Sequence, residues 1–202
     1  MSASTTIIDL LRHGETRAGP VFCGQLDAPL SDNGWTQMRD ALDGERPWQR
    51  LISSPLRRCA EFADDFGQRH GLAVEREPRW QEMHFGDWEG CSAADLMAQN
   101  PQALEAFWQD PSRHSPPGGE SLSDFRLRVL DAWDHWLVQV RGEHCLLVTH
   151  GGVMRLLIAH VLGMPLTHLL RLDIPHAAMA QLKIESIDGN ACARLVSLSG
   201  GR

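Results

Sequence analysis

Short apolar runs alternate with longer amphipathic segments along this chain, and this alternation limits its possible folds more than any other feature. The short runs are typical of buried strands, and the amphipathic segments between them are typical of helices. Two parallel strands need a long crossover connection, which a helix usually supplies. The sequence therefore predicts one domain over residues 1–202, an α/β protein with three α/β/α layers around a largely parallel sheet.

Local signals place the expected elements along the chain. Strands are expected at residues 6–11, 51–53, 73–76 and 144–149, with a hairpin of residues 178–184 and 191–198 around a turn at 188–190. Helices are expected at residues 34–42, 55–70, 93–100, 101–109, 122–141 and 151–162. Pro55 suits a first helical turn and Gly71 a helix end, and carboxylates three places after Ser92 and Ser121 resemble capping boxes. Residues 92–120 are expected to form a helical insertion over one face of the domain, above the site.

Charge and composition argue against several classes of function. The net charge of −7 and the isoelectric point near 5.8 argue against nucleic-acid binding, which needs a basic surface. Apolar runs are too short to cross a bilayer, and residues 1–6 lack the basic and apolar regions of a secretory signal. The five cysteines are scattered, odd in number and without a C-x-x-C pair, which favours reduced thiols and a cytoplasmic location.

Two histidines stand at equivalent places, each just after a predicted strand. His13 follows Arg12 and precedes Gly14, and His150 precedes Gly151. In a parallel sheet, ligands bind beyond the carboxyl ends of the strands, so two such histidines from neighbouring strands would face one another. A single histidine after a strand is more often an exposed loop residue. The matching pair, with an arginine beside one member, favours a site.

These residue types suit phosphate chemistry. A neutral imidazole is a competent nucleophile near pH 7, because its ordinary pKa of about 6.5 leaves a lone pair available. Transfer of a phosphoryl group also needs cations that stabilise its oxygens. Arg12, Arg58 and His150 can surround such a group, since Arg58 stands between a short strand and a helix, at the end that favours anions. A solvated side chain is the alternative for Arg58.

The departing oxygen needs a proton, and an acid in a desolvated setting can supply it. Residues 82–90 (EMHFGDWEG) place carboxylates among aromatic side chains. Glu82, Asp87 and Glu89 all remain candidates on this ground, whereas Phe85 and Trp88 are expected in the core or in a pocket wall.

Other chemistries lack their signatures. The sequence contains no C-x5-R loop, no D-x-D-x-[TV] signature, no G-x-S-x-G elbow and no glycine-rich nucleotide loop. A metal site is a weaker alternative, because there is no H-E-x-x-H, no H-x-H and no Cys/His cluster with ligand spacing.

Six motifs follow one another along the chain. They are LRHGET at residues 11–16, GQLDAPLS at 24–31, SSPLRR at 53–58, EMHFGDWEG at 82–90, PGGES at 117–121 and VTHGG at 148–152. Together they resemble the histidine phosphatase superfamily, which includes the phosphoglycerate mutases, in the order of that family and over most of the chain. One departure is Gly19, where many relatives carry an asparagine.

The resemblance implies a phosphohistidine intermediate on His13 and Glu82 as the proton donor. It implies a three-layer fold around a mixed, mostly parallel sheet, with neither metal nor other cofactor. The implied phosphate pocket is formed by Arg12, Arg58, His150 and Gly151. The leaving group is expected to contact the insertion and the loop at residues 14–33, with Thr16, Cys23, Gly24 and Gln25 as candidates.

Within the superfamily, the short chain, residues 82–89 and the LGMP run at 162–165 look most like the α-ribazole phosphatases. Those enzymes remove the 5'-phosphate of a benzimidazole nucleotide in cobalamin biosynthesis. The predicted function is thus a metal-independent phosphomonoesterase whose partner is a small phosphate ester. The alternatives are a broad-specificity phosphatase, a phosphoglycerate mutase, and a binding module without catalysis. Retention of both the nucleophile and the acid argues against the last.

Overall fold

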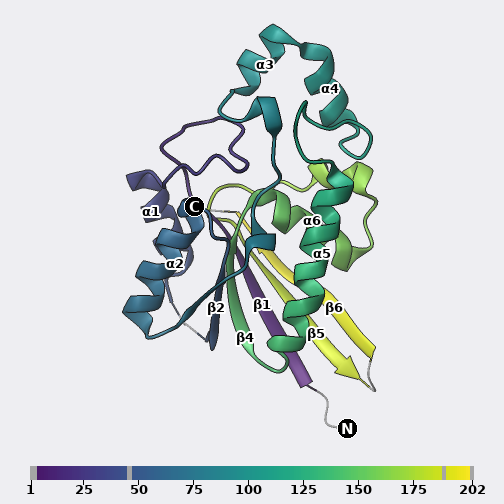
Figure 1. Ribbon diagram of the computed structural model, residues 1–202. Coiled ribbons are helices and arrows are strands. Elements are labelled where there is room, and N and C mark those ends of the chain that lie inside the picture. Colours follow the sequence, from purple (N-terminus) through teal and green to yellow (C-terminus); the bar gives the residue numbers. More distant parts are fainter. Residues whose placement is uncertain (1–3, 45–46, 188–189, 201–202) are drawn as a thin grey trace.

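A six-stranded sheet forms the centre of the computed structural model, which describes residues 4–44, 47–187 and 190–200 (Figure 1). The strand order is β3-β2-β4-β1-β5-β6. The strands are β1 (Ser4–Arg12), β2 (Arg50–Ser53), β3 (Val74–Arg76), β4 (His144–Thr149), β5 (Met179–Ile187) and β6 (Asn190–Ser199). The first four strands pair in parallel, while β5 runs antiparallel to β1 and β6 antiparallel to β5. The mixed, mostly parallel sheet and the terminal hairpin are thus confirmed; the predicted turn at 188–189 lies outside the described residues.

Helices cover both faces of this sheet, which confirms the three layers (Figure 1). Helices α1 (Asp32–Ala41) and α2 (Arg57–His70) lie on one face, and α5 (Leu122–Gln139) and α6 (Gly151–Leu162) on the other. Successive side chains of a strand point to opposite faces. Accordingly, Leu10 belongs to the hydrophobic cluster with α5 and α6, and Leu11 to the cluster with α1 and α2.

The predicted insertion is a pair of short helices beyond the carboxyl ends of the strands, at the top of Figure 1. Helix α3 (Ala93–Gln99) begins at the predicted capping box of Ser92, and α4 (Pro101–Gln109) follows directly. Leu104 and Phe107 of α4 are buried in the same cluster as α5 and α6. The insertion is therefore packed onto the domain and covers that end of the sheet.

Helix α2 begins later than the sequence predicts. Pro55 lies in a bend, and the helix starts at Arg57 with Leu56 as its N-cap. The reason is that the sheet continues one residue further, since the backbone N–H of Ser54 still donates to Val148 O of β4 at 3.0 Å. The predicted end is confirmed, with Gly71 in the left-handed conformation.

Two further findings concern the elements themselves. Among the described residues there are also three short 3-10 helices: η1 (Pro78–Trp80), η2 (Gly86–Trp88) and η3 (Leu166–Arg171). No helix in the described part of the chain is long and apolar enough to cross a membrane.

The register of β1 and β4 explains how the fold brings the two histidines together. Arg12, the last residue of β1, is paired with Thr149, the last residue of β4. Because the two strands are parallel neighbours, His13 and His150 leave the sheet side by side at the same edge.

A buried carboxylate ties the segment after β3 to helix α5. Glu77 accepts hydrogen bonds from Arg79 Nε at 2.9 Å and from Trp136 Nε1 at 3.2 Å. From α5, Arg128 donates to the backbone carbonyls of Gln81 at 2.7 Å and of Glu82 at 2.9 Å. These contacts fix the path of the chain from β3 to Glu82.

Glu77 should therefore stabilise the fold in a pH-dependent way. The hydrogen bonds from Arg79 lower its pKa from 4.5 to about 2, so its contribution is present above pH 4.5 and is lost as the pH falls towards 2. We expect Glu77→Gln to lower the free energy of unfolding by about 1–3 kcal/mol at pH 7, measured by urea denaturation. The difference should shrink as the pH falls below 4.5.

Asp131→Asn is the matched control, because Asp131 pairs with the same arginine but is largely exposed. We expect it to cost less than about 1 kcal/mol. An equal loss in both variants, or a Glu77→Gln effect that does not change with pH, would contradict the role of the buried carboxylate.

Candidate active site

A cavity of about 280 Å³ opens at the carboxyl ends of β1 and β4. Four of the residues predicted to react or to bind phosphate line it: Arg12, His13, Glu82 and Gly151. They come from distant parts of the sequence, and the sheet edge, the segment after η1 and the start of α6 bring them together. The predicted residues Arg58 and His150 lie outside this lining, and each is fully buried with 0% exposure.

His13 is placed as a nucleophile. Its side chain is 4% exposed, and its Nδ1 lies 2.7 Å from Gly14 O. A carbonyl oxygen only accepts, so Nδ1 carries the proton and the lone pair is on Nε2. Burial and the nearby cations Arg58 and Arg12 hold the pKa of His13 well below 6.5. The imidazole is therefore neutral at physiological pH.

Arg58 is a buried cation held by neutral acceptors. Its Nε donates to His150 Nδ1 at 3.2 Å, and its Nη1 donates to Leu26 O at 2.8 Å. Its Nη2 donates to the backbone carbonyls of Cys23 and Gly24. Within the described ranges, no carboxylate forms an ion pair with Arg58, so its charge is not neutralised.

His150 packs directly against the predicted nucleophile. The centroids of its ring and of the His13 ring are 5.3 Å apart in an edge-to-face arrangement. Since its Nδ1 accepts from Arg58, its Nε2 carries the proton and faces Ser54 Oγ at 2.7 Å. Burial and the charge of Arg58 hold the pKa of His150 well below 6.5. The two histidines thus face each other, as predicted from the strand ends.

Arg12 has a hydrogen-bonding group that the protein leaves unused. Its Nη1 donates to Ile174 O at 2.5 Å, whereas its Nε is buried and has no partner among the described residues. Burial lowers the pKa of Arg12 to about 10, so the guanidinium stays charged. A buried donor without a partner is costly, so an acceptor brought to Arg12 Nε would be favourable.

Of the three candidate acids, Glu82 alone lines this cavity. It is 7% exposed, and its carboxyl group accepts from Gly152 N at 2.9 Å and from Met83 N at 3.0 Å. Asp87 is exposed. A Cβ on Gly152 would lie 2.2 Å from Glu82 Oε1, so only glycine permits this approach.

Comparison with known proteins identifies the family. The family model of the histidine phosphatase superfamily (branch 1) matches residues 8–195. The chain belongs to the histidine phosphatase superfamily. A glucosyl-3-phosphoglycerate phosphatase from Mycolicibacterium vanbaalenii is 36% identical over 167 residues, which cover 77% of this chain and 74% of that protein. An adenosylcobalamin/alpha-ribazole phosphatase from Salmonella typhimurium is 29% identical over 185 residues, 87% of this chain and 89% of that protein.

Solved structures agree with the sequence comparison. A native mycobacterial glucosyl-3-phosphoglycerate phosphatase matches with a TM-score of 0.85 at 32% identity, over 97% of this chain and 99% of that one. The predicted superfamily, fold and enzyme class are therefore confirmed, and the chain is a phosphoric monoester hydrolase. The predicted likeness to α-ribazole phosphatases is found, but the glucosyl-3-phosphoglycerate phosphatase has the higher identity of these two relatives.

The loop at residues 14–33 takes part in the site in two ways: some of its residues line the cavity, and others contribute only backbone groups. Thr16 and Cys23 line the cavity, as does Gly19, whose φ of +76° suits glycine. Many members of the superfamily carry an asparagine at this place, where this chain has Gly19. The candidates Gly24 and Gln25 lie outside the lining and use their backbone groups instead.

Glu89 holds that loop in place in this member of the superfamily. Its carboxylate accepts from the backbone N–H groups of Gly24, Gln25 and Leu26 at 2.9–3.0 Å, and from that of Phe85 at 2.9 Å. The same loop gives its carbonyls to Arg58. Glu89 is thus a positioning residue for Arg58. The sequence shows a carboxylate at this place but does not reveal that role.

Two ionisable side chains in the lining, His176 and Arg155, were not predicted. The ring centroid of His176 is 5.7 Å from that of His13, and burial lowers the pKa of His176 to about 4. Arg155 lies on α6, one turn after the start of the helix. Its place four residues after Gly151 was a usable signal, because residues four apart share a helix face. His176 stands in a loop without any such signal.

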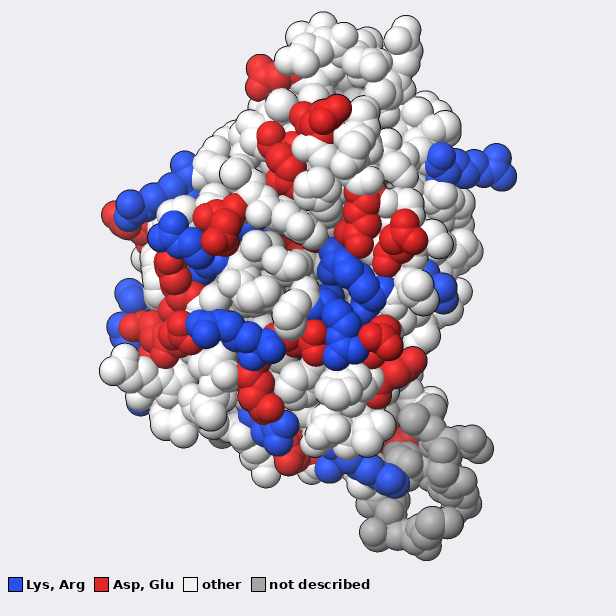
Figure 2. Space-filling view, in the orientation of Figure 1, with Lys and Arg blue, Asp and Glu red and all other residues white. Residues whose placement is uncertain are grey.

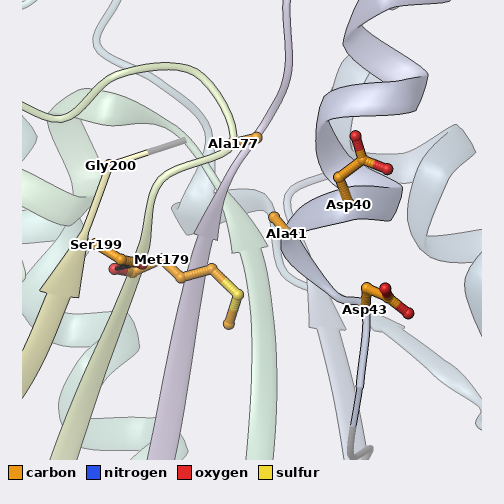
Figure 3. Close-up of a pocket in the computed structure, with 7 residues that line it drawn as sticks. All are labelled: Asp40, Ala41, Asp43, Ala177, Met179, Ser199 and Gly200. Carbon is orange, nitrogen blue, oxygen red and sulfur yellow. Dashed lines mark hydrogen bonds between the residues drawn. The ribbon is translucent and has the colours of Figure 1, made fainter. Parts of the chain in front are cut away.

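Another cavity and the metal-ligand side chains of the described residues were compared with this site. Figure 3 shows a cavity of about 460 Å³ between the end of α1 and the strands β5 and β6, and none of the predicted site residues lines it. No three His, Cys, Asp or Glu side chains in residues 4–44, 47–187 and 190–200 are grouped to hold a metal ion. On the face in Figure 2, acidic and basic side chains are interspersed.

Replacing Glu89 tests its positioning role. A glutamine presents one accepting oxygen and an NH₂ group that cannot accept from the loop's N–H groups. We expect Glu89→Gln to weaken vanadate binding and to raise KM for a phosphate ester by about tenfold each, with a smaller change in kcat. Both are measured by steady-state kinetics.

Glu61→Gln is the control, because Glu61 pairs with the exposed Arg57 on the surface of α2. It should leave vanadate binding unchanged. If Glu89→Gln lowered the melting temperature and left vanadate affinity intact, Glu89 would stabilise the fold without positioning Arg58.

Proposed function

We propose that residues 1–202 act as one catalytic domain that hydrolyses a small phosphate monoester through a phosphohistidine on His13, without a metal or another cofactor. The observation that carries this proposal is the neutral His13 beside the unpartnered Nε of Arg12 in one cavity. The free nitrogen lone pair and the free N–H donor suit phosphorus and its oxygen, respectively.

The reaction has two steps. First, His13 Nε2 bonds to phosphorus, the ester P–O bond breaks, and Glu82 gives its proton to the departing oxygen. Then a water oxygen bonds to phosphorus, the N–P bond breaks, and the proton of the water passes to Glu82. The alcohol and inorganic phosphate leave, and both residues return to their starting states.

We assign the oxygens of the transferring phosphoryl group to Arg12, Arg58 and Gly151, and we assign His150, which was predicted with them, to the support of Arg58. Arg12 offers its free Nε, and Gly151 opens helix α6, whose N-terminus favours an anion. Arg58 makes four hydrogen bonds to the protein, and a guanidinium has five N–H donors, so one remains for an oxygen. His150 supports this arrangement by holding Arg58 Nε.

A second cavity favours an organic leaving group with an apolar part. It has a volume of about 270 Å³ and shares Phe22, Glu82, Phe85 and Arg155 with the first. Phe107 and Trp108 of the insertion also line it. This aromatic wall supports α-ribazole 5'-phosphate, the substrate predicted from the sequence. The 36% identical relative supports glucosyl-3-phosphoglycerate as a second candidate.

The phosphohistidine can be trapped. Rapid quenching of the enzyme during turnover should give an acid-labile phosphoryl group on His13, identified by mass spectrometry. We expect His13→Ala to lose the label and at least about 10³-fold in kcat, because the nucleophile is removed. The exposed His160 offers a control, and His160→Ala should keep both label and rate. Wild-type activity of His13→Ala, or activity that EDTA abolishes and a metal restores, would contradict the proposal.

A substrate panel separates the candidate reactions. The panel contains α-ribazole 5'-phosphate, glucosyl-3-phosphoglycerate, 3-phosphoglycerate and p-nitrophenyl phosphate. We expect release of inorganic phosphate, and a drop of about tenfold in kcat/KM for α-ribazole 5'-phosphate in Trp108→Ala if its ring stacks there. Leu127→Ala, an exposed position on α5, is the control. Isomer formation faster than phosphate release would favour a mutase, and vanadate binding without turnover would favour a binding module.

A further inference from the structure

Two imidazole rings pack against His13, and they differ in what their nitrogens bind. The ring centroid of His150 lies 5.3 Å from that of His13, and the ring centroid of His176 lies 5.7 Å from it. Both nitrogens of His150 are used inside the protein, since Nδ1 accepts from Arg58 and Nε2 faces Ser54 Oγ. Neither nitrogen of His176 hydrogen-bonds to another of the described residues, and neither is enclosed by the protein. His176 therefore brings free hydrogen-bonding groups next to the nucleophile.

The backbone fixes His176 beside the end of β1. The next residue, Ala177, donates its N–H to His13 O at 3.2 Å. The N–H of Arg12 in turn donates to Ala178 O at 3.0 Å. Because these two hydrogen bonds join the segment after His176 to residues 12 and 13, the His176 ring keeps its place relative to the His13 ring.

The conformation of Ala177 is strained, and this strain belongs to the turn that carries His176. The φ of Ala177 is +55°, and no other non-glycine residue in the described ranges has a positive φ. Ala177 is the third residue of a turn that Ala178 N closes on Pro175 O at 3.1 Å, a place where a positive φ normally requires glycine. Strain of this kind is typical of functional sites, where the surrounding contacts offset its cost.

His176 belongs to the phosphate part of the site. It lines the cavity with Arg12 and His13, and it does not line the aromatic cavity under the insertion. Burial and the charge of Arg12 lower the pKa of His176 to about 4, so its ring is neutral at pH 7. A neutral imidazole carries one N–H donor. Since the protein offers this donor no partner, it is available to an anion that Arg12 attracts.

We propose that His176 donates a ring N–H to an oxygen of the phosphoryl group that is transferred to His13. This inference rests on the proposed function and adds a neutral donor to the cations of the phosphate site. Because the turn holds the ring in place before the substrate arrives, donation needs no rearrangement of the protein. A hydrogen bond to a charged oxygen is also stronger than one between neutral groups.

Three variants separate hydrogen-bond donation from packing. His176→Phe keeps an aromatic ring against His13 but has no N–H, whereas His176→Asn and His176→Gln place an amide NH₂ near the positions of Nδ1 and Nε2, respectively. We expect His176→Phe to raise the Kd for inorganic phosphate about tenfold in calorimetry, because a charge-assisted hydrogen bond is lost. One of the two amide variants should keep this Kd within about threefold of the wild-type value, because it keeps a donor.

Two esters show which part of the substrate His176 contacts. p-Nitrophenyl phosphate and glycerol 3-phosphate share the phosphoryl group and differ in the leaving group. We expect His176→Phe to lower kcat/KM by about tenfold for both esters, because the lost contact is to the part that they share. The exposed His160 of α6 offers the matched control, and His160→Phe should keep the wild-type Kd and kcat/KM.

Three results would overturn the assignment. A wild-type phosphate Kd in His176→Phe would mean that the ring only packs against His13. An equal loss of phosphate affinity in the Phe, Asn and Gln variants would mean that donation is not the role of this side chain. A loss of kcat/KM for one ester alone would place His176 at the leaving group.

The role of His176 and the proposed function can fail separately, because phosphate binding needs no turnover. If the wild-type protein hydrolyses neither ester, the proposed function is wrong, and the phosphate Kd values of the wild type and the three variants still decide the role of His176. If His13 carries the phosphoryl label and His176→Phe binds phosphate as the wild type does, the proposed function stands and the role of His176 is refuted.

Discussion

The burial of the Arg58 guanidinium is the constraint on which the rest of the site depends. Removing such a cation from water costs several kcal/mol unless its N–H groups find acceptors. Here the acceptors are three carbonyls of the loop at residues 23–26 and the ring of His150. The loop must bend tightly to aim its carbonyls inward, which turns its N–H groups toward Glu89. A Cβ on Gly24 would lie 2.2 Å from Met83 O, so the bend requires glycine there.

Neutral acceptors leave the positive charge of Arg58 in place, and this has a chemical consequence. The charges of Arg58 and Arg12 add to burial in lowering the pKa of His13 and of His150. Both rings therefore stay neutral, and in His13 the proton is held on Nδ1 by Gly14 O. The same cations that attract a phosphate dianion thus keep the nucleophile unprotonated. A carboxylate paired with Arg58 would weaken both effects.

Sequence reasoning succeeded where backbone geometry decides the outcome. Apolar runs predicted β1 and β4, and their parallel pairing was enough to bring His13 and His150 together. It failed where similar side chains lie close together in the sequence and only the fold determines which group each of them contacts. Glu82 and Glu89 lie in one aromatic segment, and only the fold shows that the first faces the cavity and the second accepts from the loop. Likewise, the cavity contact of His176 comes from a loop whose path no local pattern encodes.

The Gly151–Gly152 pair links the chemistry to the choice of leaving group. Glycine has no side chain, so these two positions leave space beside the start of the helix. In the structure, the protein's own side chains use the space: Glu82 approaches Gly152, and Arg12 and Arg155 flank Gly151. The acid and both cations therefore meet at the start of α6, while the aromatic wall belongs to the insertion and the loop before it. Because these parts come from different segments, the insertion can change its contacts with a leaving group while His13, Arg12 and Glu82 keep their geometry.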